Sequence, residues 1–301
     1  MISRRQFLGT LAATASSGVL QAPAGFPKPG RIAIGVCAPV RDLDTAERFG
    51  FDYLEPPAAA VAAMTEVEFQ AFRTRASSSR IRCASFNSFV RSLKVVGENV
   101  SRTDLQSYLD LCLGRCHQLG GEIVVWGSAS SRNVPENFSR DRAWNQIKEF
   151  LQMAGDTARS RQLVIAIEPL RHQESNIINT GAEALRLVRE VNHPNVRMII
   201  DYYHLRVENE DPEIIVRAKQ EIVHFHFANP EGRRWPRNPS EDREYARFFA
   251  LLRQINFRGG ISIEGNGTFQ EDARASLDFF RQELSDASSL TYEPGSASGS
   301  G

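Results

Sequence analysis

The sequence has few cysteines and histidines and no excess of charge of either sign. Its 301 residues include four cysteines and six histidines, and 36 basic residues match 36 acidic ones for a formal net charge of +0. A neutral net charge does not favour binding to nucleic acid or to a membrane surface, which are both negatively charged. The spacing of the four cysteines, Cys37, Cys83, Cys112 and Cys116, is not typical of a disulfide framework. Cys112 and Cys116 lie four residues apart, and we expect them to be a packed pair and not a metal site.

Nucleotide-binding motifs and a membrane span are also missing. No Gly-x-Gly-x-x-Gly follows the first expected strand, and no P-loop occurs. These absences lower the case for a doubly wound nucleotide-binding sheet. The one apolar run near the N-terminus, residues 9–20, is broken by Thr and Ser and is too short to span a bilayer.

The first 24 residues have the layout of an export signal. Arg4 and Arg5 form a twin-arginine pair before the apolar run, and Ala22-Pro23-Ala24 offers a small-residue cleavage site. We therefore expect residues 1–24 to be a cleavable twin-arginine (Tat) signal peptide that sends the protein to the periplasm, with an uncleaved anchor or a fortuitous arginine pair as the alternatives. The Gly/Ser-rich segment 289–301 is expected to be a disordered tail.

Between these ends, strand-like and helical patterns alternate eight times. Strands are predicted at 31–37, 51–55, 81–85, 122–126, 163–167, 196–202, 221–228 and 260–264. Helices are predicted at 42–49, 65–79, 102–119, 140–160, 181–191, 212–220, 243–254 and 270–284. Strict alternation over about 250 residues indicates an α/β protein with a single-domain (β/α)8 TIM barrel at 29–288.

Four consecutive predicted strands end on residues that can bind a metal. Glu168, Asp201, His226 and Glu264 close the fifth to eighth strands. The carboxyl ends of barrel strands meet at one face, and burying an unpaired carboxylate is costly, so we expect these side chains to share one site. Three carboxylates and an imidazole favour Mn²⁺, Mg²⁺ or Co²⁺, with Zn²⁺ also open. The alternative is that each acid pairs with its own arginine.

The motifs around these residues resemble a known superfamily. Ile167-Glu168-Pro169-Leu170 with Glu174, Asp201-Tyr-Tyr-His204, His224-Phe-His226 and Ile263-Glu264-Gly265 are similar to motifs of the xylose isomerase-like TIM barrels. Within that superfamily they most resemble the sugar phosphate isomerase/epimerase branch, which includes ketose 3-epimerases.

The resemblance implies a mechanism and roles. One divalent ion, manganese first among the candidates, would be bound by Glu168, Asp201, His226 and Glu264. Glu168 and Glu264 would also form the acid/base pair that removes and returns a proton next to a carbonyl through an enediolate. Glu174 and His204 would hydrogen-bond the substrate oxygens.

Other residues are candidates by position. Glu55, Asn87 and Trp126 end upstream strands and are expected to line the same mouth, where Trp126 offers a flat face to a sugar ring. Arg233 or Arg234, in the loop after the seventh strand, can clamp a polar group of the substrate. His224 is expected behind His226 on the same side of the strand.

These features predict a metal-dependent sugar isomerase or epimerase. A dehydratase or lyase acting on a keto-sugar or keto-glycoside would use the same site. An endonuclease IV-like repair enzyme is disfavoured by the few histidines and the neutral charge, and a non-catalytic sugar-binding protein by the intact set of four ligands. The expected partner is a small carbohydrate, with no nucleic acid, no membrane after signal cleavage, and a homo-oligomer left open.

Overall fold

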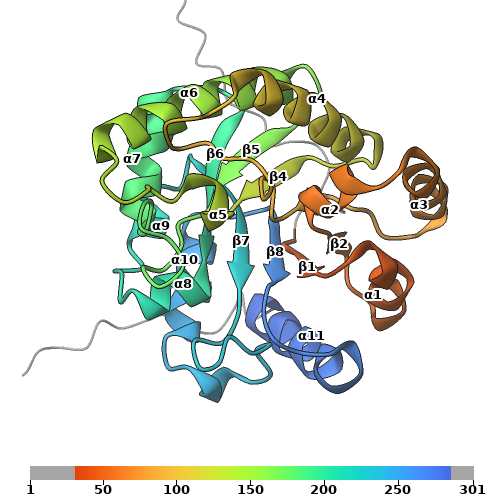
Figure 1. Ribbon diagram of the computed structural model, residues 1–301. Helices are drawn as coiled ribbons and strands as arrows, with labels where there is room; N and C mark the ends of the chain where they lie inside the picture. Colours follow the sequence, from red (N-terminus) through yellow and green to blue (C-terminus); the bar gives the residue numbers. More distant parts are fainter. Residues whose placement is uncertain (1–30, 286–301) are drawn as a thin grey trace, which may run out of the picture.

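The computed structural model describes residues 31–285, which form a nearly closed barrel of eight parallel strands with helices around the outside (Figure 1). The strands are β1 (Ala33–Cys37), β2 (Tyr53–Glu55), β3 (Ser85–Phe86), β4 (Ile123–Trp126), β5 (Val164–Ile167), β6 (Val196–Asp201), β7 (Ile222–Phe227) and β8 (Gly260–Ile263). Their order in the sheet is β2-β1-β8-β7-β6-β5-β4-β3. The predicted (β/α)8 barrel is confirmed, whereas the predictions for residues 1–24 and 289–301 lie outside the described residues.

The barrel closes between β2 and β3 through isolated contacts. Tyr53 bridges Arg82 and Pro57 bridges Asn87, and the Leu54 N–H donates to the Arg82 carbonyl at 2.9 Å. Every other neighbouring pair of strands forms a parallel ladder. We call this junction the β2–β3 seam.

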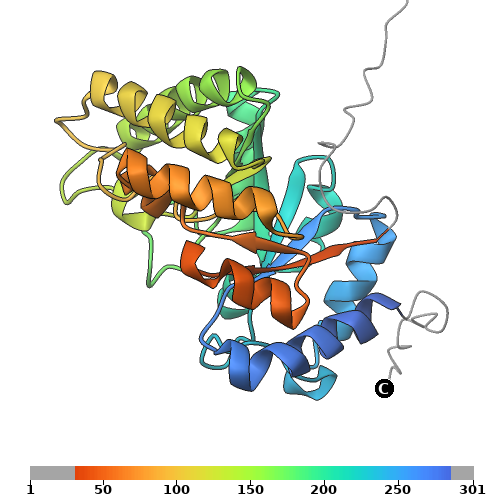
Figure 2. The same cartoon turned by 90° about the vertical axis from the view of Figure 1, so that its right-hand side faces the viewer.

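The helices cover the outer face of the strands. They are α1 (Leu43–Phe49), α2 (Ala58–Ala63), α3 (Glu66–Ser78), α4 (Arg102–Gln118), α5 (Ala129–Arg132), α6 (Arg140–Arg159), α7 (Gly181–Val191), α8 (Tyr202–Val207), α9 (Ile214–Arg217), α10 (Tyr245–Gln254) and α11 (Phe269–Ser285). Short 3-10 turns lie at Val40–Asp42 and Pro239–Glu241. In Figure 2 the last helix, α11, lies beside the first, α1, so the outer layer also comes full circle.

Alternation along the strands divides the side chains between two cores. Ile123, Val125, Ala166 and Ile199 pack together as a small cluster inside the barrel. Their neighbours in the strands, such as Val124, Ile165 and Ile167, belong to the large core between the sheet and the helices. Successive strand residues point to opposite faces, so a residue's place in this alternation decides whether it can reach the barrel mouth.

Some predicted boundaries are wrong. The predicted strand 81–85 shortens to Ser85–Phe86, because the preceding residues make only the isolated contacts of the seam. The predicted helix 212–220 is only the single turn α9. A helix that was not predicted, α8, starts directly after β6, because the Asp201 side chain accepts the Tyr203 N–H at 2.8 Å and caps it.

One other local prediction, the capping box before the third helix, is confirmed. Thr65 and Glu68 form the expected capping box at the start of α3. The four cysteines are free thiols. Within residues 31–285 no helix is long and apolar enough to cross a membrane.

Glu122 carries an energetic cost at the opposite end of β4 from Trp126. Its side chain is buried, its nearest cation is Arg82 at 3.3 Å, and its Oε2 has no hydrogen-bond partner among the described residues. Burial raises the pKa of Glu122 to about 7, although Arg82 acts in the opposite direction. The folded state therefore holds a proton that the unfolded chain, with a pKa near 4.5, releases.

We predict that Glu122→Gln stabilises the protein at pH 8 but not near pH 4. As pH rises from 4.5 to about 7 the unfolded state ionises first, so the native protein loses stability that the amide variant keeps. The difference between the unfolded-state pKa of 4.5 and the folded-state pKa of about 7 corresponds to a loss of at most about 3 kcal/mol of stability above pH 7. Thermal unfolding at the two pH values measures the difference, and an equal effect at both would show that the ionised carboxylate is not the cause.

Candidate metal centre and active site

The four predicted ligands meet at one end of the barrel. Glu168 follows β5, Asp201 ends β6, His226 lies near the end of β7, and Glu264 follows β8. One ligand atom from each lies within 4.8 Å of the others. Asp201 pairs with His226 in the sheet, so the alignment of neighbouring strands places their ends at one level. The predicted convergence is observed, and the role of these side chains as metal ligands stays a prediction.

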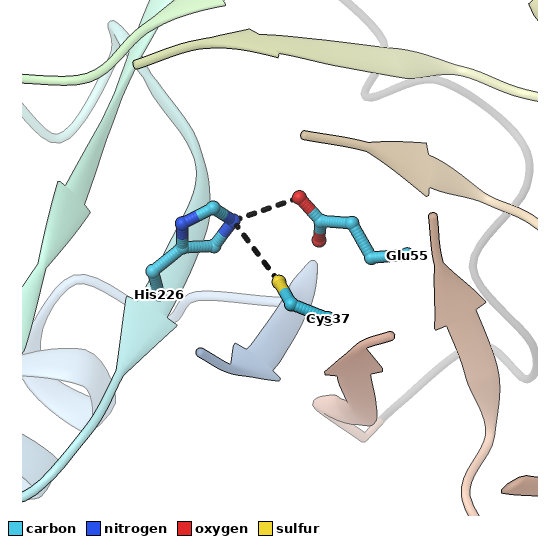
Figure 3. Close-up of side chains that lie close together, drawn as sticks. All are labelled: Cys37, Glu55 and His226. Atoms are coloured by element: carbon cyan, nitrogen blue, oxygen red, sulfur yellow. Dashed lines mark hydrogen bonds and ion pairs between the residues drawn. The ribbon is translucent and has the colours of Figure 1, made fainter. Parts of the chain in front are cut away.

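His226 is the centre of the group, and its two ring nitrogens face different partners. Nδ1 lies 3.1 Å from Glu168 Oε1 and 3.3 Å from Glu264 Oε2. Nε2 lies 2.8 Å from Glu55 Oε1 and 3.9 Å from the Cys37 thiol (Figure 3). A histidine ligand usually donates its second N–H to a carboxylate, which fixes the ring and its tautomer. This geometry leaves Nδ1 for a cation.

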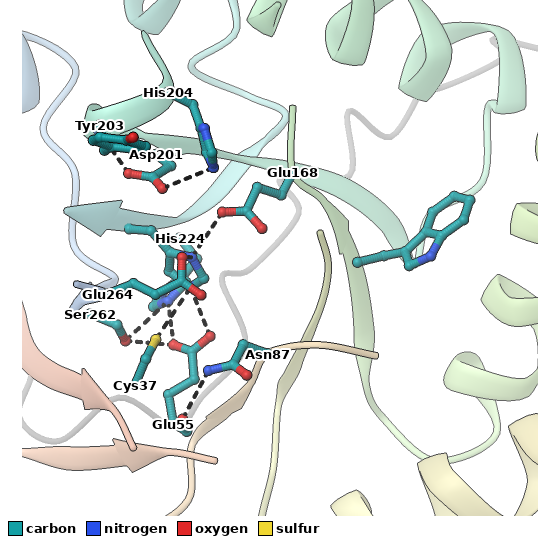
Figure 4. A network of polar contacts seen from close by, with 12 residues as sticks. Cys37, Glu55, Asn87, Glu168, Asp201, Tyr203, His204, His224, Ser262 and Glu264 are labelled. Atoms are coloured by element: carbon teal, nitrogen blue, oxygen red, sulfur yellow. Dashed lines mark hydrogen bonds and ion pairs between the residues drawn. The ribbon is translucent and has the colours of Figure 1, made fainter. Parts of the chain in front are cut away.

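Glu55 is buried among side chains of the barrel interior, and its predicted substrate-binding role stays a prediction. Its carboxylate is fully buried, with Oε2 2.8 Å from His224 Nε2 and accepting the Ser262 hydroxyl at 2.5 Å. Figure 4 shows it below the ligand group, beside Cys37 and Ser262. Burial opposes ionisation of Glu55, but His226 and His224 outweigh it and hold its pKa below the ordinary value. Glu55 is therefore the anion that supports both histidines.

The four candidate ligands Glu168, Asp201, His226 and Glu264, here called the quartet, include acids whose pKa values shift in different directions. Burial raises the pKa of Asp201 to about 7, although the Arg233 charge beside it acts in the opposite direction. Burial and the negative charge of Glu264 raise the pKa of Glu168. Burial acts in the same direction on Glu264, but His226 and Arg233 outweigh it and hold that pKa at about 2. Crowded, buried carboxylates of this kind favour a bound cation.

Arg233 lies over the same acids. Its Nη2 is 2.7 Å from Glu264 Oε2 and 3.5 Å from Asp201 Oδ2, and its Nη1 is 3.5 Å from Glu174 Oε1. The guanidinium also stacks 4.9 Å above the Tyr203 ring. Arg233 therefore contacts three acids at once, and the four ligands are not neutralised by separate arginines. Arg234 instead pairs with Glu231 away from the quartet.

His204 is placed to donate a hydrogen bond at the site. Its side chain is buried, and its Nδ1 accepts the Arg171 N–H at 3.2 Å, which leaves the proton on Nε2. Nε2 lies 3.5 Å from Asp201 Oδ2 and has no hydrogen-bond partner among the described residues. Burial and the nearby Arg233 lower the pKa of His204 to about 3, so the ring is neutral. Glu174, held by Arg171 at 2.7 Å, lies at the edge of the same group.

The structure places the two other predicted residues differently. The Trp126 side chain is fully buried outside the barrel, where its Nε1 donates to Ser131 at 3.0 Å and its ring lies 4.9 Å from that of Phe150. Because Val125 points inward, Trp126 must point outward, and the expectation that it faces a sugar is wrong. Asn87 lies beside the network, where its Nδ2 donates to the Glu55 carbonyl at 3.1 Å.

Three contributors to the network were not predicted. Cys37, Tyr53 and Ser262 lie below the quartet, with the Tyr53 hydroxyl 2.8 Å from Ser262 Oγ. Ser262 lies in β8, two residues before Glu264, and the end of that strand was already a candidate. Counting alternate residues back from Glu264 would have pointed to Ser262. No comparable signal marks Cys37, because a lone cysteine at a strand end is more often a packing residue.

The residues present fit a single divalent cation. Four donors of nitrogen and carboxylate type converge, Glu55 fixes the imidazole, and burial raises the pKa of both Glu168 and Asp201, which a bound cation would lower again. Fold and site together therefore define a TIM barrel with a candidate metal centre at the carboxyl ends of β5–β8.

Comparison with known proteins gives the family. The model of the xylose isomerase-like TIM barrel family matches residues 43–283, and the chain belongs to that family. It is 27% identical over 223 residues to an L-ribulose 3-epimerase of Methylomonas sp. (strain DH-1), covering 73% of this chain and 75% of that protein. It is 26% identical over 168 residues to the 3-dehydro-D-guloside 4-epimerase of Escherichia coli (strain K12), covering 54% and 63%. A D-psicose 3-epimerase structure, obtained in the presence of D-fructose, superposes with TM-score 0.74 at 19% identity, covering 84% and 99%.

We predict that Mn²⁺ raises the melting temperature of the protein and that Asp201→Asn abolishes this effect. At a free Mn²⁺ concentration 100 times Kd, the added stability is about 2.7 kcal/mol. The amide can still cap α8, and it removes a buried charge next to Glu168 and Glu264, so the variant without metal should be no less stable than the wild type.

Differential scanning calorimetry with and without Mn²⁺ checks both parts of this prediction. Glu122→Gln, at the other end of the barrel, is the matched control and should keep the full Mn²⁺ response. A normal response in Asp201→Asn would exclude that side chain as a ligand.

Proposed function

We propose that this protein is a divalent-metal-dependent sugar epimerase that moves a proton at a carbon next to a carbonyl. The observation that carries the proposal is the pair Glu168 and Glu264, whose carboxylates both lie against His226 Nδ1 within the candidate metal centre. The sugar epimerases among the relatives support the reaction class. A ketose or a keto-glycoside is the substrate class that the relatives suggest.

The two glutamates have the properties that an epimerase requires. One carboxylate must accept the proton from one face of the carbon, and a second acid must deliver a proton to the other face. Glu264 is ionised at neutral pH, whereas Glu168 has a raised pKa, so their environments separate the base from the acid. They project from β5 and β8, with β6 and β7 between them in the sheet. For the reverse reaction the two roles exchange.

The remaining residues bind and orient the substrate. The quartet would hold the cation, which supplies Lewis-acid stabilisation of the negative charge on the substrate oxygens. The Nε2–H of neutral His204 and the guanidinium of Arg233 are donors for those oxygens, and Glu174 accepts from a hydroxyl. General acid/base catalysis contributes only ~10²–10⁴-fold, so orientation and charge stabilisation must provide the rest of the acceleration.

We predict that the metal-loaded protein incorporates deuterium from D₂O into one carbon of an epimerised sugar. L-Ribulose, D-psicose and 3-keto-D-glucoside are the test substrates, with Mn²⁺ as the metal. Glu168→Gln and Glu264→Gln should each lower turnover by ~10²–10⁴-fold, because an amide neither accepts nor donates the proton. NMR of the sugar products gives both the exchange and the epimer ratio.

The same NMR experiment tests a control variant and the alternative reaction. Glu122→Gln should exchange like the wild type. An unsaturated product would show a dehydratase or lyase in place of an epimerase, and exchange that persists in both glutamine variants would exclude the proposed pair.

We also propose that the protein is exported by the twin-arginine route. The support is the arginine pair at Arg4 and Arg5 before an apolar segment. The protein should be found in the periplasmic fraction, and a double Lys substitution of the pair should retain it in the cytoplasm. Cytoplasmic location of the wild-type chain would refute the export proposal without affecting the enzymatic one.

A further inference from the structure

Arg132, at the end of α5, is a fully buried arginine near the candidate active site. Its side chain has 0% exposure, and its guanidinium stacks 5.4 Å from the Trp126 ring. Within residues 31–285 no carboxylate lies within ion-pair distance of it. A charge buried without an ion pair is costly, so its local contacts need an explanation.

Its hydrogen bonds go to the backbone at the ends of two neighbouring strands. Nη1 donates to the Trp126 carbonyl at 2.8 Å, and Nη2 donates to the Glu168 carbonyl at 2.6 Å. The Trp126 carbonyl also accepts the Glu168 N–H at 3.3 Å. Both backbone polar groups of Glu168 are therefore fixed by the same small cluster, one of them directly by Arg132.

The sequence around Glu168 explains why an arginine is needed there. The paired ladder of β4 and β5 ends at Trp126 and Ile167, and among the described residues no backbone N–H donates to the Glu168 carbonyl. The Glu168 carbonyl therefore needs a donor from outside the sheet. Arg132 supplies that donor.

The Glu168 side chain depends on the absence of a side chain at position 127. A Cβ built on Gly127 would overlap Glu168 Oε2, so the carboxylate passes directly over this glycine. Gly127 leaves room for the carboxylate, and Arg132 fixes the backbone from which the side chain projects. Burial lowers the pKa of Arg132 to about 10, while the charges of Glu168 and Glu183 act to raise it, so the guanidinium stays positive at neutral pH.

We propose that Arg132 is a positioning residue, which fixes the end of β5 so that Glu168 reaches both the metal and the substrate carbon. This inference rests on the proposed function for the substrate part and on the candidate metal centre for the rest. It also gives Trp126 a role: the indole covers the guanidinium from outside the barrel and does not contact a sugar.

The test compares Arg132→Met with Arg115→Met. Arg115 is a matched control because it is also buried, stacks on Phe69 at 4.7 Å and donates to the carbonyls of Val61, Ala62 and Met64, at the end of α2 and not at the site. Each variant is measured for melting temperature, for Mn²⁺ affinity by titration with the metal alone, and for kcat and KM.

If Arg132 positions Glu168, Arg132→Met weakens Mn²⁺ binding by about 10- to 100-fold and lowers kcat more than it changes KM. Arg132→Lys keeps the charge and can reach one carbonyl. Its Mn²⁺ affinity and kcat should therefore lie between those of Arg132→Met and those of the wild type. Arg115→Met should lose melting temperature but keep Mn²⁺ affinity and kcat within about twofold, a range set by its distance from the ligands.

Wild-type Mn²⁺ affinity in folded Arg132→Met, or an equal loss in Arg115→Met, would overturn the proposal. If Arg132→Met does not fold, Arg132→Lys decides: weaker Mn²⁺ binding supports the proposal, and unchanged binding overturns it. Because Mn²⁺ affinity needs no substrate, a wild-type protein that binds Mn²⁺ but converts no sugar would refute only the proposed function.

Discussion

The structure depends on the burial of several negative charges at the carboxyl end of one barrel. Glu55, Glu168, Asp201 and Glu264 lie within two layers around a single imidazole, His226. Carboxylates packed this closely repel each other and lose their hydration, so each needs a compensating positive charge or a proton. The structure provides this compensation through the histidines that hydrogen-bond Glu55 and through Arg233, which lies over the four candidate ligands.

This arrangement explains why the quartet is chemically useful. The three carboxylates of this site, two of them buried, repel one another in the empty fold, and a bound cation would offset that repulsion. The same environment separates the pKa of Glu168 from that of Glu264. Under the proposed function, one constraint would serve both metal affinity and proton transfer, and Arg233 would contact the acids and a substrate from the same position.

The sequence predicted the parts of the molecule that follow from chain order. Strand ends on one face of a barrel must converge, so Glu168, Asp201, His226 and Glu264 could be grouped by their positions in the chain alone. Side-chain direction was less predictable. Trp126 and Glu55 both end strands, but Trp126 points outward and Glu55 points inward, below the mouth. The alternation of side chains along β4 could have predicted that Trp126 points outward. β2 has only three residues, which is too short for its alternation to predict the direction of Glu55.

Elements whose stability comes from tertiary contacts were also missed. The turn α5 has four residues and would not form alone, but its Arg132 is held by two strand ends. Helix α8 depends on the Asp201 cap, so a residue chosen as a metal ligand also ends a strand and starts a helix. A local sequence pattern does not show that one residue is both a candidate metal ligand and a helix cap, because the two roles depend on different neighbours in the folded structure.

The β2–β3 seam gives the barrel an uneven resistance to opening. The candidate ligands belong to β5–β8, which are joined by parallel ladders with one register shift between β6 and β7, whereas the seam on the other side has only isolated bridges. Local fluctuations open the regions with the fewest hydrogen bonds first. Local opening of the barrel would therefore displace β2, which carries Glu55, before it separates the four candidate ligands. The hydrogen bond between Glu55 and His226 would then be lost first, while Glu168, Asp201, His226 and Glu264 stay together.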